Sequence, residues 1–146
     1  MEFNVFWRIK MRIDYSNKEI INNKEIHIHD AVFTGFNYDY ENNIIAFEAI
    51  EYYYKKHFKF KFGNVFGFEM LSCDFWGHSP HINVWYTSDT NDLSTKMKDI
   101  QREKKWELRL KDTNKWVESI ISFISGDTLT IVCEYIEFEE NEYQGE

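Results

Sequence analysis

Histidines and acidic residues are the side chains of this 146-residue chain that could carry chemistry. His27 and His29 stand two residues apart, which places both imidazoles on the same face of a strand. His78 and His81 have a spacing that short loops can fold around zinc. A metal-dependent enzyme that uses these four histidines, with Asp30 beside the first pair, is therefore one hypothesis.

A structural role for the histidines is the interpretation that we favour. A catalytic zinc needs three protein ligands in fixed geometry and hydrogen-bonded groups that orient them, and nothing in the sequence brings the two pairs together. Asp30 is suited to accepting backbone N–H bonds at the start of a strand. The chain also lacks a serine-nucleophile elbow, a phosphate-binding glycine loop and an HExxH motif. We therefore expect no cofactor, no resident metal and no enzymatic activity.

Charge and cysteine content narrow the classes of partner. The chain has 25 acidic and 17 basic residues and a net charge of -8, so it would repel a phosphate backbone. Cys73 and Cys133 are too few for a disulfide framework and suit buried strand ends, where a thiol packs as a small hydrophobe. The start of the chain lacks the features of a signal peptide, and no stretch approaches the ~18 apolar residues of a membrane span. We expect a cytoplasmic protein that binds neither nucleic acid nor membranes.

Two features remain that could form a binding surface for another protein. The first is a loop with an adjacent aromatic pair, because loop aromatics often anchor interfaces, although Trp76 would serve equally well as a plug at one end of the fold. The second is an acidic run near the C-terminus, which would form a negative strip beside an edge strand and attract a basic partner. Such a strip would equally protect that edge from pairing with other chains. We predict partner contacts from Asp74, Phe75, Trp76, Glu137, Glu139 and Glu140.

Alternating apolar and polar residues predict strands along most of the chain. The aromatic-rich stretch from Ile26 to Leu71 predicts three long strands, with a tight turn at Asn42-Asn43 and a sharp bend at Gly63-Asn64. The polar segment 16–24 is expected to be a loop with one helical turn. Further strands are predicted over 3–15, 82–87, 106–111, 116–124 and 128–139, and one short amphipathic helix over 92–104.

These elements predict a single domain, 1–146, that is all-β or β-dominated α+β. About eight strands and one short helix would form a curved antiparallel sheet, arranged as a sandwich or an open barrel. Aromatic residues make up 18% of the chain and favour a pleated, half-buried surface. A curved sheet of this kind could also enclose a cavity, so a β-barrel that binds a small apolar ligand is a further alternative.

Three runs between His29 and Gly77 carry a resemblance to known proteins: HDAVFTGFNYDYENNIIAFEA, FGNVFGFEM and DFWG. They resemble a pattern found in small uncharacterised bacterial β-rich domains, some of which are classed as immunity proteins of polymorphic toxin systems. Such proteins are cytosolic partners that neutralise a toxin domain by binding it. The resemblance implies a β-rich fold and a non-enzymatic, protein-binding function of the immunity type.

Overall fold

The computed structural model describes residues 8–23, 26–72, 79–143 and 145 of the chain. This part is β-dominated, with eight strands in one antiparallel sheet and two helices, neither of which is long and apolar enough to cross a membrane. In chain order the elements are β1 (Arg8–Asp14), α1 (Glu19–Asn22), β2 (Val32–Phe33), β3 (Asn37–Asp39), β4 (Ile44–Glu51), β5 (Lys56–Leu71), β6 (Ile82–Thr87), α2 (Asp92–Glu103), β7 (Val117–Phe123) and β8 (Thr128–Glu142).

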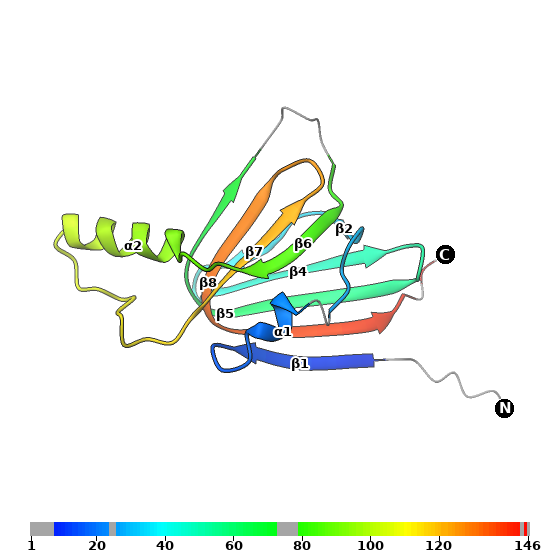
Figure 1. Cartoon of the computed structure of the whole chain (residues 1–146), viewed down its shortest axis with the longest axis horizontal. Coiled ribbons are helices and arrows are strands. Elements are labelled where there is room, and N and C mark those ends of the chain that lie inside the picture. Colours follow the sequence, from blue (N-terminus) through cyan, green and yellow to red (C-terminus); the bar gives the residue numbers. More distant parts are fainter. Residues whose placement is uncertain (1–7, 24–25, 73–78, 144, 146) are drawn as a thin grey trace.

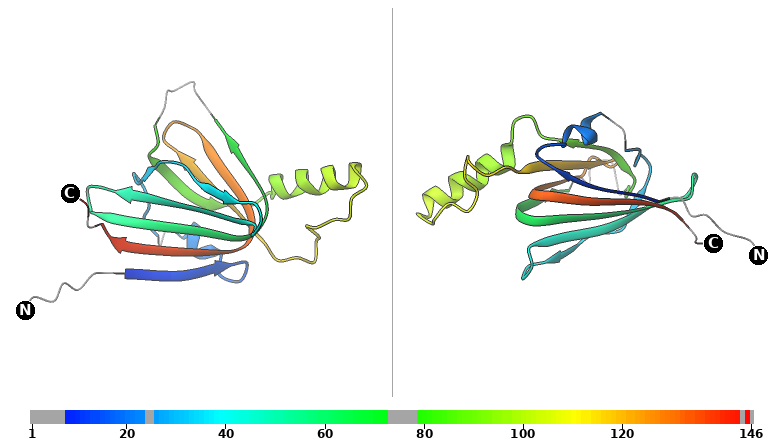
Figure 2. Two further views of the ribbon diagram at one scale, coloured as in Figure 1. Left: turned by 180° about the vertical axis from the view of Figure 1, so that it is seen from behind. Right: turned by 90° about the horizontal axis from the view of Figure 1, so that it is seen from below.

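The long strands β5 and β8 form the middle of the sheet. The strand order is β2-β4-β5-β8-β7-β6, with β1 beside β8 and β3 beside β4. On its second edge, β8 pairs with β7 along its first half and with β1 along its second half (Figure 1). The sheet curls strongly, so that its two ends approach each other (Figure 2).

Backbone hydrogen bonds join the two ends of the curled sheet. The amide of Asp30 donates to the carbonyl of Ile82 (2.8 Å), and the amide of Phe33 donates to the carbonyl of Pro80 (2.9 Å). Because β2 also pairs with β4, this segment lies between β4 and the start of β6. The chain around Asp30 is thereby fixed in position, which matters for the cleft described below.

Phenylalanine rings fill the inner side of the curl. Phe58, Phe60 and Phe62 of β5 are fully buried beside Phe138 of β8. Phe47 of β4 stacks on Phe60 with ring centroids 4.4 Å apart. An aromatic pair of this kind contributes on the order of 0.5–1.5 kcal/mol beyond the area that it buries. The rings occupy the interior in which an apolar ligand of a β-barrel would lie.

A sharp bend in β5 lets the two long strands follow the curl. Asn64 adopts a left-handed backbone conformation (φ 48), and its side-chain amide donates to Glu134 of β8 (2.6 Å). Gly63 lets the ring of Tyr135 lie over the strand beside it, because a Cβ at that position would lie 1.9 Å from the ring. The register between the two strands shifts just beyond this point. The bend predicted from Gly63-Asn64 is confirmed.

The predicted β-dominated fold with a curved antiparallel sheet is also confirmed, and the sheet forms one continuous layer. Asn43 takes the left-handed conformation expected of its turn (φ 56), and Gly126 takes a positive φ in the β7–β8 hairpin. The helical turn expected in 16–24 is α1, and the predicted amphipathic helix is α2.

Two predicted strands are wrong. In place of one long strand from Ile26 to Tyr40 there is coil followed by β2 and β3, because Asp30 (φ 67) interrupts the extended chain before β2 and Gly35 (φ 130) interrupts it between β2 and β3. Residues 106–111 form no strand. Their alternation has another cause: Leu110 packs against α2 in a second, smaller core, while Trp106 remains exposed.

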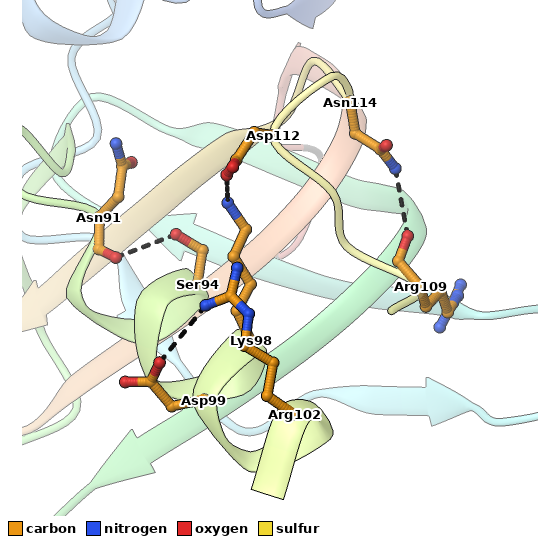
Figure 3. Close-up of polar contacts among 8 residues, drawn as sticks. All are labelled: Asn91, Ser94, Lys98, Asp99, Arg102, Arg109, Asp112 and Asn114. Atoms are coloured by element: carbon orange, nitrogen blue, oxygen red, sulfur yellow. Dashed lines mark hydrogen bonds and ion pairs between the residues drawn. The ribbon is translucent and has the colours of Figure 1, made fainter. Parts of the chain in front are cut away.

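The second core attaches α2 and the irregular segment after it to the outer face of the sheet. It contains Leu93 of α2, Leu110 and Val132 of β8. An ion pair between Lys98 and Asp112 joins the helix to the segment that follows (Figure 3). We call residues 92–116 the arm, because α2 projects away from the sheet in both orientations of Figure 2.

The N-terminus of α2 is capped by a side chain from the sheet. Asn91, at the N-cap position, has a left-handed backbone and makes no side-chain capping bond. The buried carboxylate of Glu118 on β7 instead accepts the amides of Ser94 (2.8 Å) and Leu93 (3.3 Å). A carboxylate in this place also interacts favourably with the helix dipole. Glu118 therefore fixes the arm to the sheet.

We predict that Glu118→Ala lowers the free energy of unfolding by about 1–3 kcal/mol, because two buried amides lose their acceptor. Urea unfolding followed by circular dichroism measures this change. Glu118→Gln keeps an acceptor oxygen and is the matched control, for which a smaller loss is expected. An unfolding midpoint for Glu118→Ala equal to that of the unsubstituted protein would contradict the capping role.

Candidate functional site

Three consecutive tyrosines form the turn that joins β4 to β5. Tyr52, Tyr53 and Tyr54 are 57%, 81% and 72% exposed. The buried carboxylate of Glu51 fixes the turn by accepting the amides of Tyr53 (2.9 Å) and Tyr54 (2.6 Å). Lys55 then takes a left-handed conformation (φ 56) that leads the chain into β5. We call residues 52–55 the tyrosine turn, a fixed loop that exposes three large side chains.

The tyrosine rings pack against one another and against the end of the chain. The rings of Tyr53 and Tyr54 are nearly perpendicular, with centroids 4.7 Å apart. Tyr52 makes a similar edge contact with Tyr143 at 5.6 Å, and the amide of Tyr143 donates to the carbonyl of Lys55 (2.7 Å). Rings held in this way lose little freedom when a partner binds.

A cleft of about 570 Å³ opens beside the tyrosine turn. One wall is the segment 27–30, which the closure of the sheet holds in place. Within it, Asp30 has a left-handed backbone (φ 67), and its carboxylate lies 3.5 Å from Nε2 of His29. The other wall is the turn itself. The lining residues are His27, His29, Asp30, Glu51, Tyr53, Tyr54 and Lys56.

Lys56 links the cleft to a buried carboxylate. Its Nζ lies 3.5 Å from Oε1 of Glu140, whose strand partner is Phe58 on the inner side of the sheet. Burial raises the pKa of Glu140, and the charges of Lys56 and His27 oppose this rise only in part. A carboxyl group held in this way beside a cleft can exchange a proton or pair with a cation.

Two of the described histidines, His29 and His81, make separate contacts with backbone carbonyls. Nδ1 of His29 lies 2.9 Å from the carbonyl oxygen of Asn83, and Nδ1 of His81 lies 3.2 Å from that of Asp30. Within the described ranges, no group of three or more His, Cys, Asp or Glu side chains could hold a metal ion. His27 and His29 share the cleft, whereas His78 lies outside the described residues.

The acidic residues Glu137 and Glu139 lie on the outer face of β8, between basic side chains of its neighbours. Lys61 of β5 and Arg12 of β1 each lie 3.8 Å from a carboxylate oxygen of Glu137, and Arg8 pairs with Glu139. As expected, these acidic residues lie beside an edge strand, because β1 pairs only with β8 among the described strands, but they are paired with basic side chains there. Partner contacts from these residues stay a prediction.

The predicted binding loop and one of the two cysteines cannot be placed, since Cys73, Asp74, Phe75 and Trp76 lie outside the described residues. Cys133 is buried in β8, and burial raises the pKa of its thiol, in keeping with a small hydrophobic side chain.

The tyrosine turn was not among the residues predicted from the sequence. Its signal is present: three tyrosines and two lysines stand between two strongly alternating segments, where a hairpin needs polar turn residues. Bulky rings at a turn have no inner face to fill, so their exposure could have been predicted.

Glu140→Gln is expected to raise the free energy of unfolding at pH 8. The pKa of Glu140 is higher in the fold than in the unfolded chain, so its contribution to stability falls as the pH rises between the two values. Denaturant unfolding of Glu140→Gln and of the unsubstituted protein at several pH values measures this effect. The difference between their free energies of unfolding should shrink as the pH falls to about 4, near the ordinary pKa of glutamate.

The exposed Glu142, two residues further along β8, gives the matched control Glu142→Gln, for which we expect no such pH-dependent gain. If the unsubstituted protein were more stable than Glu140→Gln at pH 8, the ion pair with Lys56 would outweigh desolvation and the interpretation would be wrong.

Comparison with known proteins adds no relative to this picture. The chain matches no protein-family model, no curated protein and no solved structure. Its function must therefore be inferred from the tyrosine turn, the cleft and their charges.

Proposed function

We propose that this chain is a non-enzymatic protein-binding domain that contacts its partner through the tyrosine turn. The observation that carries the proposal is the exposure of three consecutive tyrosines on a fixed turn beside a cleft. Tyrosine is enriched at the energetic centres of interfaces, because its ring offers a large contact area at a low cost in conformational entropy. Its hydroxyl group can keep a hydrogen bond when the ring is buried.

The charges around the turn favour a basic partner. Asp30, Glu51 and Lys56 line the cleft and Glu140 lies next to Lys56, so three carboxyl groups and one ammonium lie in or beside the cleft. A lysine or arginine of the partner would meet tyrosine rings and carboxylates, both of which attract a cation. The net charge of -8 would accelerate encounter with a basic protein and disfavours nucleic acid.

The resemblance to immunity proteins suggests the class of partner. An immunity-type protein acts by covering a toxin domain and needs no catalytic group of its own. We propose that this protein acts in that way in the cytoplasm, with the tyrosine turn and the cleft against a basic toxin domain. The loop containing Asp74, Phe75 and Trp76 remains a candidate for further contacts.

We predict that Tyr53→Ser combined with Tyr54→Ser abolishes partner binding and leaves the fold intact, since both rings are largely exposed. The tagged protein is recovered from its source cells, the retained protein is identified by mass spectrometry, and the affinity of the purified pair is measured by calorimetry. The double substitution should weaken binding roughly 100-fold, at about tenfold for each tyrosine.

Tyr40→Ser is the matched control, because Tyr40 is also 81% exposed but lies in the turn at the other end of β4. It should bind as tightly as the unsubstituted protein, and affinity should fall with added salt if the partner is basic. Binding that survives the double substitution would refute the proposed surface. Turnover of a small substrate without any retained macromolecule would refute the proposed function.

A further inference from the structure

The second half of β5 forms an open edge of the sheet. β4 pairs with β5 only from Lys56 to Phe62, whereas β8 continues to pair with it as far as Leu71. Between Phe66 and Leu71, β5 therefore has a hydrogen-bonded neighbour on only one side among the described strands, and it is the outermost strand there in Figures 1 and 2. Such an edge offers a row of backbone groups to another chain.

A groove of about 360 Å³ lies between this edge and the arm. Residues 66–68 line it on the strand side, and Met97, Ile100 and Trp106 line it on the arm side. Trp106 is 61% exposed and Ile100 is exposed as well, although both side chains are large and apolar. Exposed apolar side chains grouped beside an open strand edge are typical of a surface that another chain covers.

Fixed contacts keep the groove in shape. Gly67 lies so close to the arm that a Cβ on it would be 2.5 Å from the sulfur of Met97. The guanidinium of Arg109 lies 5.3 Å from the ring centroid of Phe66 and donates to the side chain of Asn64 (3.1 Å). Further contacts within the arm are drawn in Figure 3, where the main-chain carbonyl of Arg109 accepts a bond from Asn114. The arm is thus braced against β5.

The arm is basic although the chain as a whole is acidic. Residues 92–116 contain eight basic and five acidic side chains, a local charge of +3, against -8 for the whole chain. Four exposed lysines of the arm have no ion-pair partner within the described part of the chain: Lys104, Lys105, Lys111 and Lys115. The charged residues that line the groove itself, Arg109 and Glu107, are of opposite sign, so it is the excess positive charge of the surrounding arm that favours an acidic occupant.

We propose that the groove binds an extended, acidic segment of a partner protein, which adds a strand to the open edge of β5. Backbone hydrogen bonds to residues 66–71 would supply affinity. Because side chains of a strand alternate, every second residue of the segment would enter the groove against Ile100 and Trp106. Its acidic residues would face the basic arm, of which Arg109 lines the groove itself.

This surface is separate from the tyrosine turn, which precedes β5 and lies at its other end. The two surfaces also differ in charge, so they select different partners or different parts of one partner. Failure of one proposal leaves the other standing.

A library of random peptides displayed on phage, selected against the whole protein, tests the inference. Enriched peptides should be rich in Asp and Glu, with apolar residues at alternate positions. Arg109→Glu should weaken binding of an enriched synthetic peptide at least about tenfold, whereas Lys115→Glu, the same charge change outside the groove lining, should have a much smaller effect. Tyr53→Ser with Tyr54→Ser should leave peptide binding unchanged.

Backbone methylation of the peptide tests strand addition directly. Only every second amide of an added strand faces β5, so methylating one alternating set of nitrogens should abolish binding and methylating the other should not. Trp106→Ser, at an exposed side chain, gives a second groove variant if Arg109→Glu alters the melting curve.

Several results would overturn the inference. These are the absence of any enriched peptide, enrichment of basic peptides, and equal tolerance of both methylation sets. Peptide binding that neither Arg109→Glu nor Trp106→Ser weakens would also overturn it. Sedimentation that shows a dimer lost in Trp106→Ser would instead identify a second copy of this chain as the occupant.

Discussion

Paired strands of 16 and 15 residues cannot remain flat against a small core, because they twist and must bend to stay in contact with it. In this protein the pair is β5 with β8, and Asn64 and Gly63 supply the bend. The ring of Tyr135 lies over Gly63, and the Asn64 side chain bonds to Glu134 across the pair. Every other strand joins the sheet through β5 or β8, directly or through one further strand.

Both proposed surfaces are consequences of that long pair. β4 leaves β5 at Phe62, just before the bend, so the first half of β5 is interior and the second half is an edge. The first half begins at the tyrosine turn, whose rings pack against the end of the chain that follows β8. The second half lies against the arm at Gly67. The pairing of β5 with β8 therefore sets the position of a mildly acidic cleft at one end and of a groove beside the basic arm at the other.

Local patterns in the sequence predict the local part of this structure. Alternation identifies β5, β6, β7 and β8, and the residues Gly63-Asn64 predict the bend, because each signal lies within the element that it describes. Alternation of apolar and polar residues predicts a strand wrongly where another contact causes it. Leu110 is the apolar residue among polar neighbours because it packs under α2. Alternation also cannot predict which strands flank β8. The ion pairs of Glu137 with basic side chains of β1 and β5 were therefore not predicted.

The candidate site depends still more on contacts between distant residues. The charge of His27 acts on Glu140 only because closure of the sheet holds residues 30–33 between β4 and the start of β6. The cap of α2 is similar, since Glu118 lies in a strand that follows the helix by many residues.

The central claim is that the β5–β8 ladder is one cooperative unit that holds both surfaces in place. Residue-resolved hydrogen exchange of the native protein tests it most directly. We expect ladder amides on both sides of the Gly63-Asn64 bend to exchange slowest, with one common opening free energy equal to that of global unfolding. If the half beyond the bend opened separately at a much lower free energy while the first half stayed protected, the claim would be wrong.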